Sequence, residues 1–394
     1  MARIPPVQPS HPAVSPSHWR RLLKKPTMKG INIVGYCGDP SGIGEASRST
    51  ARAALRAGCP ISTINIGLTP LDEWPSQWRE TDHTPRYATS VVHDNIALAK
   101  DQPENYSWGP QKSWKRRTPK RTVGYWYWEL SELPEEFWPS FELVDEVWVP
   151  TRFVYEALRA HTDKPIVIVP PAIDTTDAQP MSREEFGLPG GRFLFLTMTS
   201  VHSVLERKNP LGVIDAFERA FDNHDDVGLV LKLTDAELRP DVDALVREAA
   251  QRLPLFLISR TLSRSATLAL ISRTDAYVSL HRSEGFGLPI AEAMALGKPA
   301  IATAYSGNMD FTNKETAFLV DYHLTELRES RVVYPAGSQW AEPDLECAAR
   351  HMRSVVFDEV QRQRVSRAGQ VLVSRQYDAK MGAAVIGERI QAFA

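Results

Sequence analysis

The strongest pattern in the sequence is HRSEGFGLPIAEAMALGKPAIATA, residues 281 to 304. The run before it, AYVSL at 276–280, is apolar and has the length of a buried strand. PIAEAMAL predicts a helix, with Pro289 at its favoured first position and Gly297 just past its end. The loop HRSEGFG (281–287) therefore joins the carboxyl end of a strand to a helix N-terminus. In parallel α/β sheets ligands bind at this edge, and the N–H groups and dipole of the helix favour a phosphate.

Short apolar runs alternate with amphipathic stretches along most of the chain, which predicts parallel α/β units. The expected strands are 31–37, 60–68, 146–150, 164–170, 192–198, 227–233, 255–258, 276–280 and 298–304, and the expected helices are 45–58, 151–161, 209–222, 241–253 and 265–274.

The length of 394 residues is too great for one comfortable core, so two domains are expected. A flexible, Pro- and Ser-rich tail occupies residues 1–29, and a first Rossmann-like domain occupies 30–172. The Pro-, Gly- and polar-rich segment 173–191 is the expected linker, and a second Rossmann-like domain follows at 192–375. The predicted fold class is α/β, with two doubly wound sheets that face each other across a cleft.

The composition excludes several classes of protein. The formal net charge of −2 argues against a nucleic-acid partner, and no apolar run approaches the roughly 18 residues of a membrane span. The N-terminus lacks the apolar core of a signal peptide, and its basic piece HWRRLLKK (18–25) allows peripheral contact with a membrane or another subunit; a solvated tail is the alternative. Cys37, Cys59 and Cys347 lack metal-ligand spacing. This predicts a cytoplasmic protein without a structural metal.

Two glutamates, Glu284 and Glu292, are separated by seven residues in the opening stretch. Gly285 and Gly287 allow a ligand to approach the backbone closely. Carboxylates accept hydrogen bonds, so two of them beside a phosphate site suit a polyhydroxyl ligand: one takes sugar hydroxyls and the other ribose hydroxyls. In the alternative, Glu292, expected in the first helical turn, only complements the helix dipole and Glu284 is a solvated loop residue.

A second constellation, SVLERKNP at 203–210, follows the first strand of the second half. Arg207 and Lys208 suit a diphosphate, with Arg207 bidentate and Lys208 as a point charge. The alternative is a pair of solvated surface cations.

A third constellation is the glycine-rich loop CGDPSGIGEASR at 37–48, which follows a strand and opens a helix. Its glycines, Gly38, Gly42 and Gly44, also suit the nucleotide loop of a short-chain dehydrogenase. That alternative requires an acidic residue at the end of the second strand and a Tyr-x-x-x-Lys motif, and the sequence has neither.

Tryptophan is concentrated in one region: six of the ten lie between Trp108 and Trp148. Trp126 and Trp128 alternate with tyrosines as in a strand, which favours core packing. The basic run 111–121 is a candidate contact for an acceptor or for anionic lipid headgroups.

Several segments together resemble retaining glycosyltransferases of the GT-B fold, glycosyltransferase family 4, in a bacterial branch linked to polysaccharide assembly. The resemblance covers roughly residues 31 to 375, and residues 284–303 match the family's E-x7-E signature. It implies two facing Rossmann-like domains with a return helix at 376–394 that packs on the N-terminal domain. The other matching segments are SGIGEASR, GYWYWEL, VDEVWVPTRFV, ERKNPLGVIDAF, SGNMDF and YPAGSQWAEPD.

The resemblance also assigns roles. It implies that Glu284 binds the donor sugar and Glu292 the ribose, and that Arg207 and Lys208 neutralise the diphosphate. The remaining donor-binding residues are expected to act through backbone amides or close approach: Gly285, Phe286, Gly287, Leu288, Gly42 and Gly44. His93 is a candidate to orient the acceptor hydroxyl, with a structural role as the alternative.

The expected function is transfer of a hexose-type sugar from a GDP- or UDP-linked donor to a saccharide or lipid-linked saccharide, with no metal or other cofactor. Two alternatives explain part of the pattern. A glycoside hydrolase would use Glu284 and Glu292 as acid and base, but this leaves Arg207, Lys208 and the glycine loops unexplained. A non-catalytic GT-B subunit would bind nucleotide or a partner enzyme without turnover.

Overall fold

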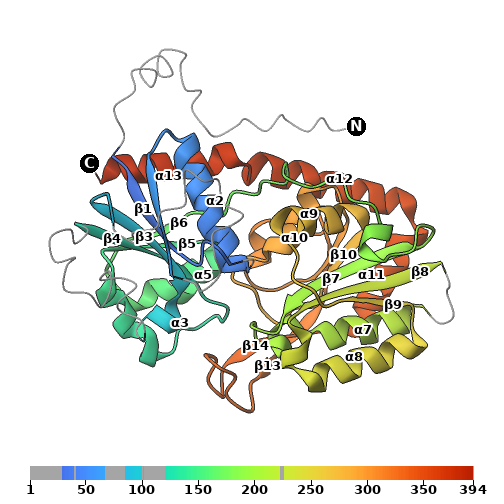
Figure 1. Cartoon of the computed structure of the whole chain (residues 1–394). Helices are drawn as coiled ribbons and strands as arrows, with labels where there is room; N and C mark the ends of the chain where they lie inside the picture. The colour runs from blue at the N-terminus through green and yellow to red at the C-terminus, as the bar shows by residue number, and fades with distance from the viewer. Residues whose placement is uncertain are drawn as a thin grey trace, which may run out of the picture.

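The structure, a computed structural model, describes residues 29–39, 41–66, 85–99, 101, 120–221 and 226–393. It contains two six-stranded parallel sheets with helices packed on them, one in each half of the chain (Figure 1). The predicted α/β class with two Rossmann-like domains is confirmed. The domain boundaries drawn from the sequence stay predictions.

The N-terminal sheet has the strand order β2-β1-β3-β4-β5-β6. Its core contains the tryptophans of the aromatic region: Trp126, Trp128 and Trp148 are fully buried, which confirms the core-packing interpretation for Trp126 and Trp128. The strands are β1 (Ile31–Gly35), β2 (Ile61–Asn65), β3 (Thr89–Asn95), β4 (Arg121–Tyr127), β5 (Glu146–Val149) and β6 (Ile166–Ile168), and the helices include α2 (Gly42–Arg56), α3 (Ile96–Ala99) and α5 (Arg152–Leu158).

The C-terminal sheet has the strand order β12-β11-β10-β7-β8-β9. Its strands are apolar on both faces because helices cover both sides, as in other parallel sheets. The strands are β7 (Phe193–Ser200), β8 (Val227–Thr234), β9 (Leu255–Ile258), β10 (Ala276–Ser279), β11 (Ala300–Thr303) and β12 (Phe318–Val320), and the helices are α6 (Leu205–Lys208), α7 (Pro210–Ala220), α8 (Pro240–Arg252), α9 (Arg264–Arg273), α10 (Leu288–Ala295) and α11 (Leu345–Phe357).

Each sheet has a topological switch point, where neighbouring strands lead into connections on opposite faces. In the C-terminal sheet it lies between β7 and β10, and in the N-terminal sheet between β1 and β3. Ligands of doubly wound sheets bind at such points, beyond the carboxyl ends of the strands. We therefore expect a ligand-binding site beyond the carboxyl ends of the strands at these switch points.

Two elements from the end of the chain reach the N-terminal domain. Helix α12 (Glu359–Gln376) leads into α13 (Ala379–Ala392), which lies beside α2 (Figure 1). Ile386 and Ile390 of α13 belong to the same apolar cluster as Ile31 of β1, so the expected return helix is confirmed.

The second element is the antiparallel hairpin of β13 (Tyr322–Glu326) and β14 (Gln339–Pro343). Leu327, Tyr334 and Trp340 from this hairpin and its connecting loop pack in one cluster with Trp128. Part of the segment assigned by sequence to the second domain thus completes the core of the first.

Two helices begin earlier than expected. Ser41 caps α2 by accepting a hydrogen bond from the Gly44 N–H, so this helix starts at Gly42 rather than residue 45. Helix α10 starts at Leu288, which places Pro289 at its second position. No helix within the described ranges is long and apolar enough to cross a membrane. The N-terminal tail up to residue 28 and most of the basic run, 111–119, lie outside the described residues.

Candidate active site at the β7–β10 edge

Glu284 lies in the loop that follows β10, and the next loop fixes its backbone. The Glu284 N–H donates to Ser306 Oγ (2.8 Å), and its carbonyl accepts from the Gly307 N–H (2.9 Å). A Cβ at Gly307 would lie 2.3 Å from the carbonyl oxygen of Gly285, so this position requires glycine. The segment SGN at 306–308 therefore serves as a support for the glutamate loop.

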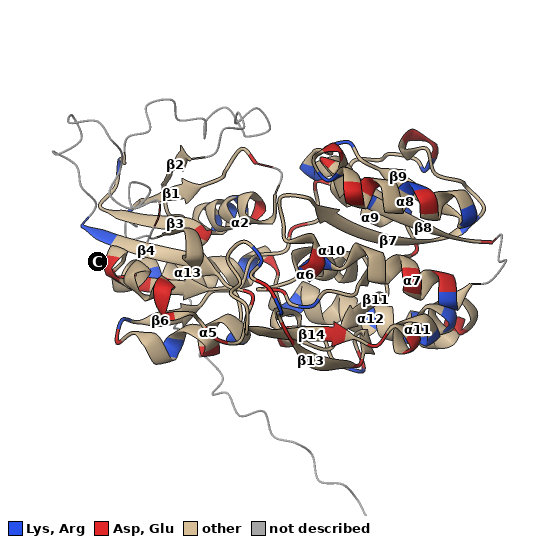
Figure 2. Cartoon of the chain, turned by 90° about the horizontal axis from the view of Figure 1, so that it is seen from below, with Lys and Arg blue, Asp and Glu red and all other residues tan. Residues whose placement is uncertain are grey.

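The Glu284 carboxylate is buried and paired with both predicted cations. Arg207 Nη1 lies 3.3 Å from its Oε2, and Lys208 Nζ lies 2.5 Å from its Oε1. Burial opposes the charge, but Lys208 and Arg207 outweigh this effect and lower the pKa of Glu284 to about 2. The solvated-loop alternative for Glu284 is wrong, and so is the solvated-surface alternative for the two cations. Figure 2 shows acidic and basic segments meeting around α6, between the two domains.

Asn209 directly follows Arg207 and Lys208 and fixes the position of this segment. Its role was not predicted from the sequence. Its backbone is left-handed (φ 53°), and its Oδ1 accepts from the Gly212 N–H (3.2 Å) at the start of α7. Its Nδ2 donates to the carbonyl of Leu280 (3.0 Å), which ties α6 and α7 to the end of β10. An asparagine directly before Pro210 is a sequence signal for such a cap.

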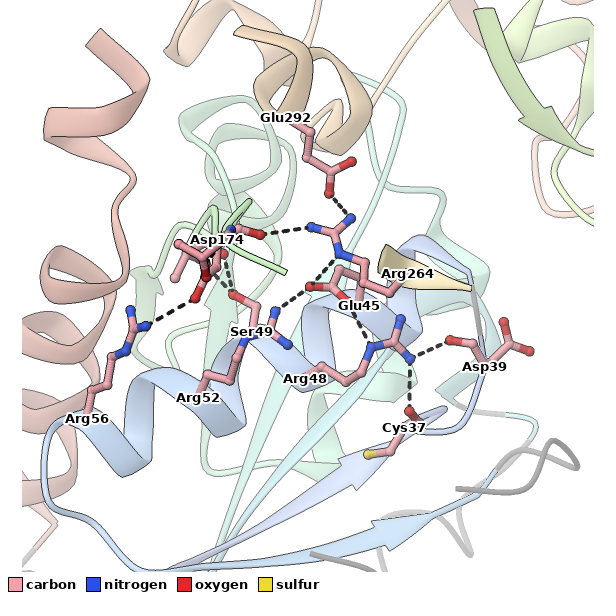
Figure 3. A network of polar contacts seen from close by, with 12 residues as sticks. Cys37, Asp39, Glu45, Arg48, Ser49, Arg52, Arg56, Asp174, Arg264 and Glu292 are labelled. Atoms are coloured by element: carbon pink, nitrogen blue, oxygen red, sulfur yellow. Dashed lines mark hydrogen bonds and ion pairs between the residues drawn. The ribbon is translucent and has the colours of Figure 1, made fainter. Parts of the chain in front are cut away.

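Glu292 is also buried, but its partner is Arg264 at the start of α9. Arg264 Nη1 bonds Glu292 Oε1, and the same guanidinium contacts Glu45 of α2 (Figure 3). Because α10 begins at Leu288, Glu292 lies in the second turn rather than the first. The dipole-only alternative for Glu292 is therefore wrong. Arg264 and Glu45 were missed because nothing in the sequence near either residue marks a contact between residues 45, 264 and 292.

The loop residues between the two glutamates contact the N-terminal domain. Thr151 Oγ1 donates to the carbonyl of Gly285 (2.8 Å), and a Cβ at Gly285 would lie 3.1 Å from the carbonyl oxygen of Trp128. Phe286 turns its ring into the C-terminal core. Gly287 has a left-handed backbone (φ 90°) and directly precedes Leu288, the first residue of α10. Their role in donor binding stays a prediction.

The glycine-rich loop is closed by Arg48. Its Nη1 donates to the carbonyls of Cys37 (2.9 Å) and Asp39 (2.7 Å). A Cβ at Gly44 would lie 2.1 Å from the Asp39 carbonyl oxygen, whereas Gly42 has open space around it. Gly44 thus serves the tight loop itself, and Glu45 and Arg264 connect this loop to Glu292.

His93 lies inside β3. It is fully buried, and both ring nitrogens lack hydrogen-bond partners among the described residues. Its ring centroid is 4.4 Å from that of Tyr125, and burial lowers the pKa of His93 to about 3. A catalytic role for this residue stays a prediction.

Glu129, which follows β4, brings a third carboxylate to this edge. Its Oε2 accepts from Tyr334 Oη (2.8 Å) and from Asn95 Nδ2 (3.3 Å), and its carbonyl accepts from Ser283 Oγ. These contacts join the N-terminal sheet, the glutamate loop and the β13–β14 hairpin. Glu129 lies in GYWYWEL (124–130), where the aromatic residues are the prominent pattern, so its role was not predicted.

Both glutamates are nearly inaccessible: Glu284 is 8% exposed and Glu292 is 2% exposed. Two surface cavities lie elsewhere, one beside the linker residue Arg183 and one beside Trp138. Access of a ligand to the glutamates therefore requires the two domains, or the side chains between them, to move apart.

The comparisons with known proteins point to the same edge. Residues 180–327, which include Arg207, Lys208, Glu284 and Glu292, match the family model of Glycosyl transferases group 1. No curated protein matches this chain.

Solved structures match over most of the length. Alr3699/HepE of Anabaena, in complex with UDP and glucose, has a TM-score of 0.64 at 13% identity, over 92% of this chain and 100% of that chain. Sucrose-phosphate synthase of Thermosynechococcus elongatus has a TM-score of 0.67 at 16% identity, over 93% and 99%. A glycosyltransferase of Rickettsia africae has a TM-score of 0.64 at 15% identity, over 93% and 100%. The chain therefore has the two-domain GT-B fold, and its residues 180–327 match the Glycosyl transferases group 1 family.

Proposed function

We propose that this protein is a retaining glycosyltransferase of family 4. It moves a hexose-type sugar from a nucleotide diphosphate sugar to a saccharide or lipid-linked saccharide in polysaccharide assembly. The observation that carries the proposal is the cluster of Arg207, Lys208 and Glu284 at the β7–β10 switch point, inside the region that matches the family. GDP- and UDP-linked sugars are the candidate donors, and the UDP and glucose bound to Alr3699/HepE support UDP.

The two cations have the chemistry that departure of a nucleoside diphosphate requires. As the bond between the anomeric carbon and the phosphate oxygen breaks, negative charge grows on the diphosphate, and Arg207 and Lys208 stabilise it without a metal. In the structure both cations are bonded to Glu284. Donor binding therefore exchanges a carboxylate for a diphosphate as their partner and frees Glu284 to accept hydrogen bonds from sugar hydroxyls.

The acceptor reacts on the face that the leaving group vacates. The acceptor oxygen forms its bond to the anomeric carbon, and its proton passes to the departing phosphate oxygen, so no side-chain base is required. A lipid-linked acceptor would bring this cytoplasmic protein to the inner face of the membrane, where the basic piece at 18–25 offers a contact.

A thermal-shift panel with GDP, UDP, dTDP and ADP, with and without Mg²⁺, tests the donor site. A nucleotide present at 100 times its Kd adds about 2.7 kcal/mol to the free energy of unfolding. We expect one nucleotide to stabilise the protein without metal and to lose this effect in Glu292→Ala. Stabilisation by none of the four would overturn the proposal. Binding without transfer to any acceptor would instead support a non-catalytic GT-B subunit.

A further inference from the structure

Arg264 connects Glu292 to the N-terminal domain. It is the first residue of α9, and its Nη1 bonds Oε1 of Glu292 in α10. Its Nε lies 3.4 Å from Oε1 of Glu45 in α2, and its Nη2 donates to the carbonyl of Asp174 (3.3 Å). Figure 3 shows this guanidinium between the two carboxylates. One side chain thus bridges carboxylates that belong to different domains.

The two carboxylates differ in how well their charge is compensated. Glu45 contacts Arg48 (2.8 Å) and Arg52 besides Arg264, and these arginines together outweigh its burial and lower its pKa to about 2. Glu292 has Arg264 as its direct partner. Burial, together with the neighbouring charge of Glu45, outweighs Arg264 and raises the pKa of Glu292. The charge on Glu292 therefore depends on Arg264.

The groups that face Glu292 come from three elements besides its own helix. They are Arg264 of α9, Glu45 and Arg52 of α2, and Tyr277 of β10. The Tyr277 hydroxyl is neutral at physiological pH, because burial raises its pKa. Two of the three charged groups thus belong to the N-terminal domain, although Glu292 is expected to bind a ligand of the C-terminal domain.

We propose that Arg264 and Glu45 are positioning residues for the ribose of the donor nucleotide. Arg264 holds the Glu292 carboxylate charged and in place, and Glu45 holds Arg264 from the opposite domain. The inference rests on the proposed function, because it assumes that Glu292 accepts hydrogen bonds from ribose hydroxyls. Its consequence is that full affinity for the nucleoside requires the two domains to be in contact through α2.

The two residues are expected to act in distinguishable ways. Arg264→Gln removes the cation that pairs with Glu292 and orients its carboxylate, so the pKa of Glu292 rises further and the carboxylate is protonated more readily as the pH falls. Glu45→Gln removes the second anchor of Arg264, together with the ion pairs of Glu45 to Arg48 and Arg52. It also removes a like charge that raises the pKa of Glu292. The first change is expected to be pH-dependent and the second is not.

Isothermal titration with UDP and 2′-deoxy-UDP, and in parallel GDP and 2′-deoxy-GDP, tests the inference. We expect the wild type to prefer the ribonucleotide about tenfold, which is the value of one good hydrogen bond. In Arg264→Gln this preference falls towards one, and the loss is greater at pH 6.5 than at pH 8.5. In Glu45→Gln it falls about threefold at both pH values. Arg264→Lys, which keeps the charge, retains the pH profile of the wild type.

Arg56→Gln is the matched control. Arg56 lies on α2, the helix of Glu45, and pairs with Asp174 (3.1 Å) without contacting Glu292. It should leave both affinities unchanged. A lower melting temperature with an unchanged preference for ribose would show that Arg264 is merely structural and would overturn the inference. A wild type that binds neither UDP nor GDP overturns the proposed function and the inference together. A preference for ribose that the wild type shows and that Arg264→Gln and Glu45→Gln both retain overturns the inference alone.

Discussion

Arg207 Nη1 lies 3.3 Å from Oε2 of Glu284, although the two residues are 77 positions apart in the chain. Arg207 also donates from Nη1 to the carbonyl of Ser283 (2.7 Å), so it holds both the side chain and the backbone of the glutamate loop. The cation proposed for the diphosphate thus lies against the carboxylate proposed for the sugar. A donor that binds here replaces the Glu284 carboxylate as the partner of Arg207 and leaves that carboxylate for its sugar.

Replacement of Glu284 tests this arrangement. We expect Glu284→Gln to lower kcat by about 10²- to 10³-fold, which is typical of losing one group that stabilises a transition state. Loss of the carboxylate also leaves Arg207 and Lys208 without their carboxylate partner, and removal of one partner from a buried pair costs about 3–5 kcal/mol. Steady-state kinetics and urea unfolding measure the two effects. Glu329→Gln removes an exposed ion pair with Arg331 and should change neither.

Acid should lower the free energy of unfolding by protonating the carboxylate of Glu284. The pKa of Glu284 is about 2 in the folded protein and about 4.5 when unperturbed, so the unfolded state binds a proton first as the pH falls. The stabilisation is complete above about pH 4.5 and is lost as the pH falls towards 2. Urea unfolding at pH 5 and pH 3 measures it. If Glu284→Gln loses as much stability as the wild type between these pH values, the ion pairs do not control the acid response.

Protonation linked to His93 should lower the free energy of unfolding at a higher pH than protonation linked to Glu284. Its pKa is about 3 when folded and 6.5 when unperturbed, so below pH 6.5 protons bind the unfolded state preferentially. We expect stability to fall between pH 6.5 and 5 in the wild type, and this slope to decrease in His93→Leu, which keeps the side chain apolar and neutral. An unchanged slope would contradict the prediction. A hundredfold fall of kcat in the same variant would assign His93 to the acceptor.

The glycine-rich loop offers a matched pair of substitutions. A Cβ at Gly44 would lie 2.1 Å from the Asp39 carbonyl oxygen and 2.7 Å from that of Tyr36, so Gly44→Ala must displace backbone. We expect it to lower the free energy of unfolding by about 1–3 kcal/mol. Gly42→Ala meets nothing within 4 Å and should be neutral or stabilising by up to about 1 kcal/mol, because alanine favours a helix. Equal effects in urea unfolding would contradict the assigned role of Gly44.

Local sequence patterns were sufficient for β1, β2, β5–β11 and one edge of the site, but β12–β14, α11 and α12 were not predicted. Arg207 and Glu284 each follow an apolar strand, and both strands lie in one parallel sheet, so their meeting at its carboxyl edge could be expected. The start of α10 was misplaced by one residue, because Pro289 is favoured at the first position and is tolerated at the second. Such an error is enough to move Glu292 from the first turn to the second.

Contacts between the domains could not be predicted in the same way. Arg264 lies in a polar loop-to-helix segment, and only the folded arrangement brings it between Glu292 and Glu45. The hairpin loop that contains Tyr334 has no helical or strand period, so its apolar residues gave no sign that they pack against Trp128. Periodicity reports which face of an element is buried, but it does not report which distant segment buries it.

That hairpin gives the last prediction. Tyr334 Oη donates to Glu129 Oε2 (2.8 Å), and both side chains are buried where the β13–β14 hairpin enters the N-terminal core. Tyr334→Phe leaves Glu129 with one donor fewer, which should cost about 1–3 kcal/mol. Hydrogen exchange should become faster in the hairpin and in the glutamate loop, because Glu129 also accepts from Ser283 through its carbonyl. Tyr322→Phe is the control, because it removes a hydroxyl from a half-exposed ring on the same hairpin. An equal response in that variant would show that the Glu129 contact does not join the domains.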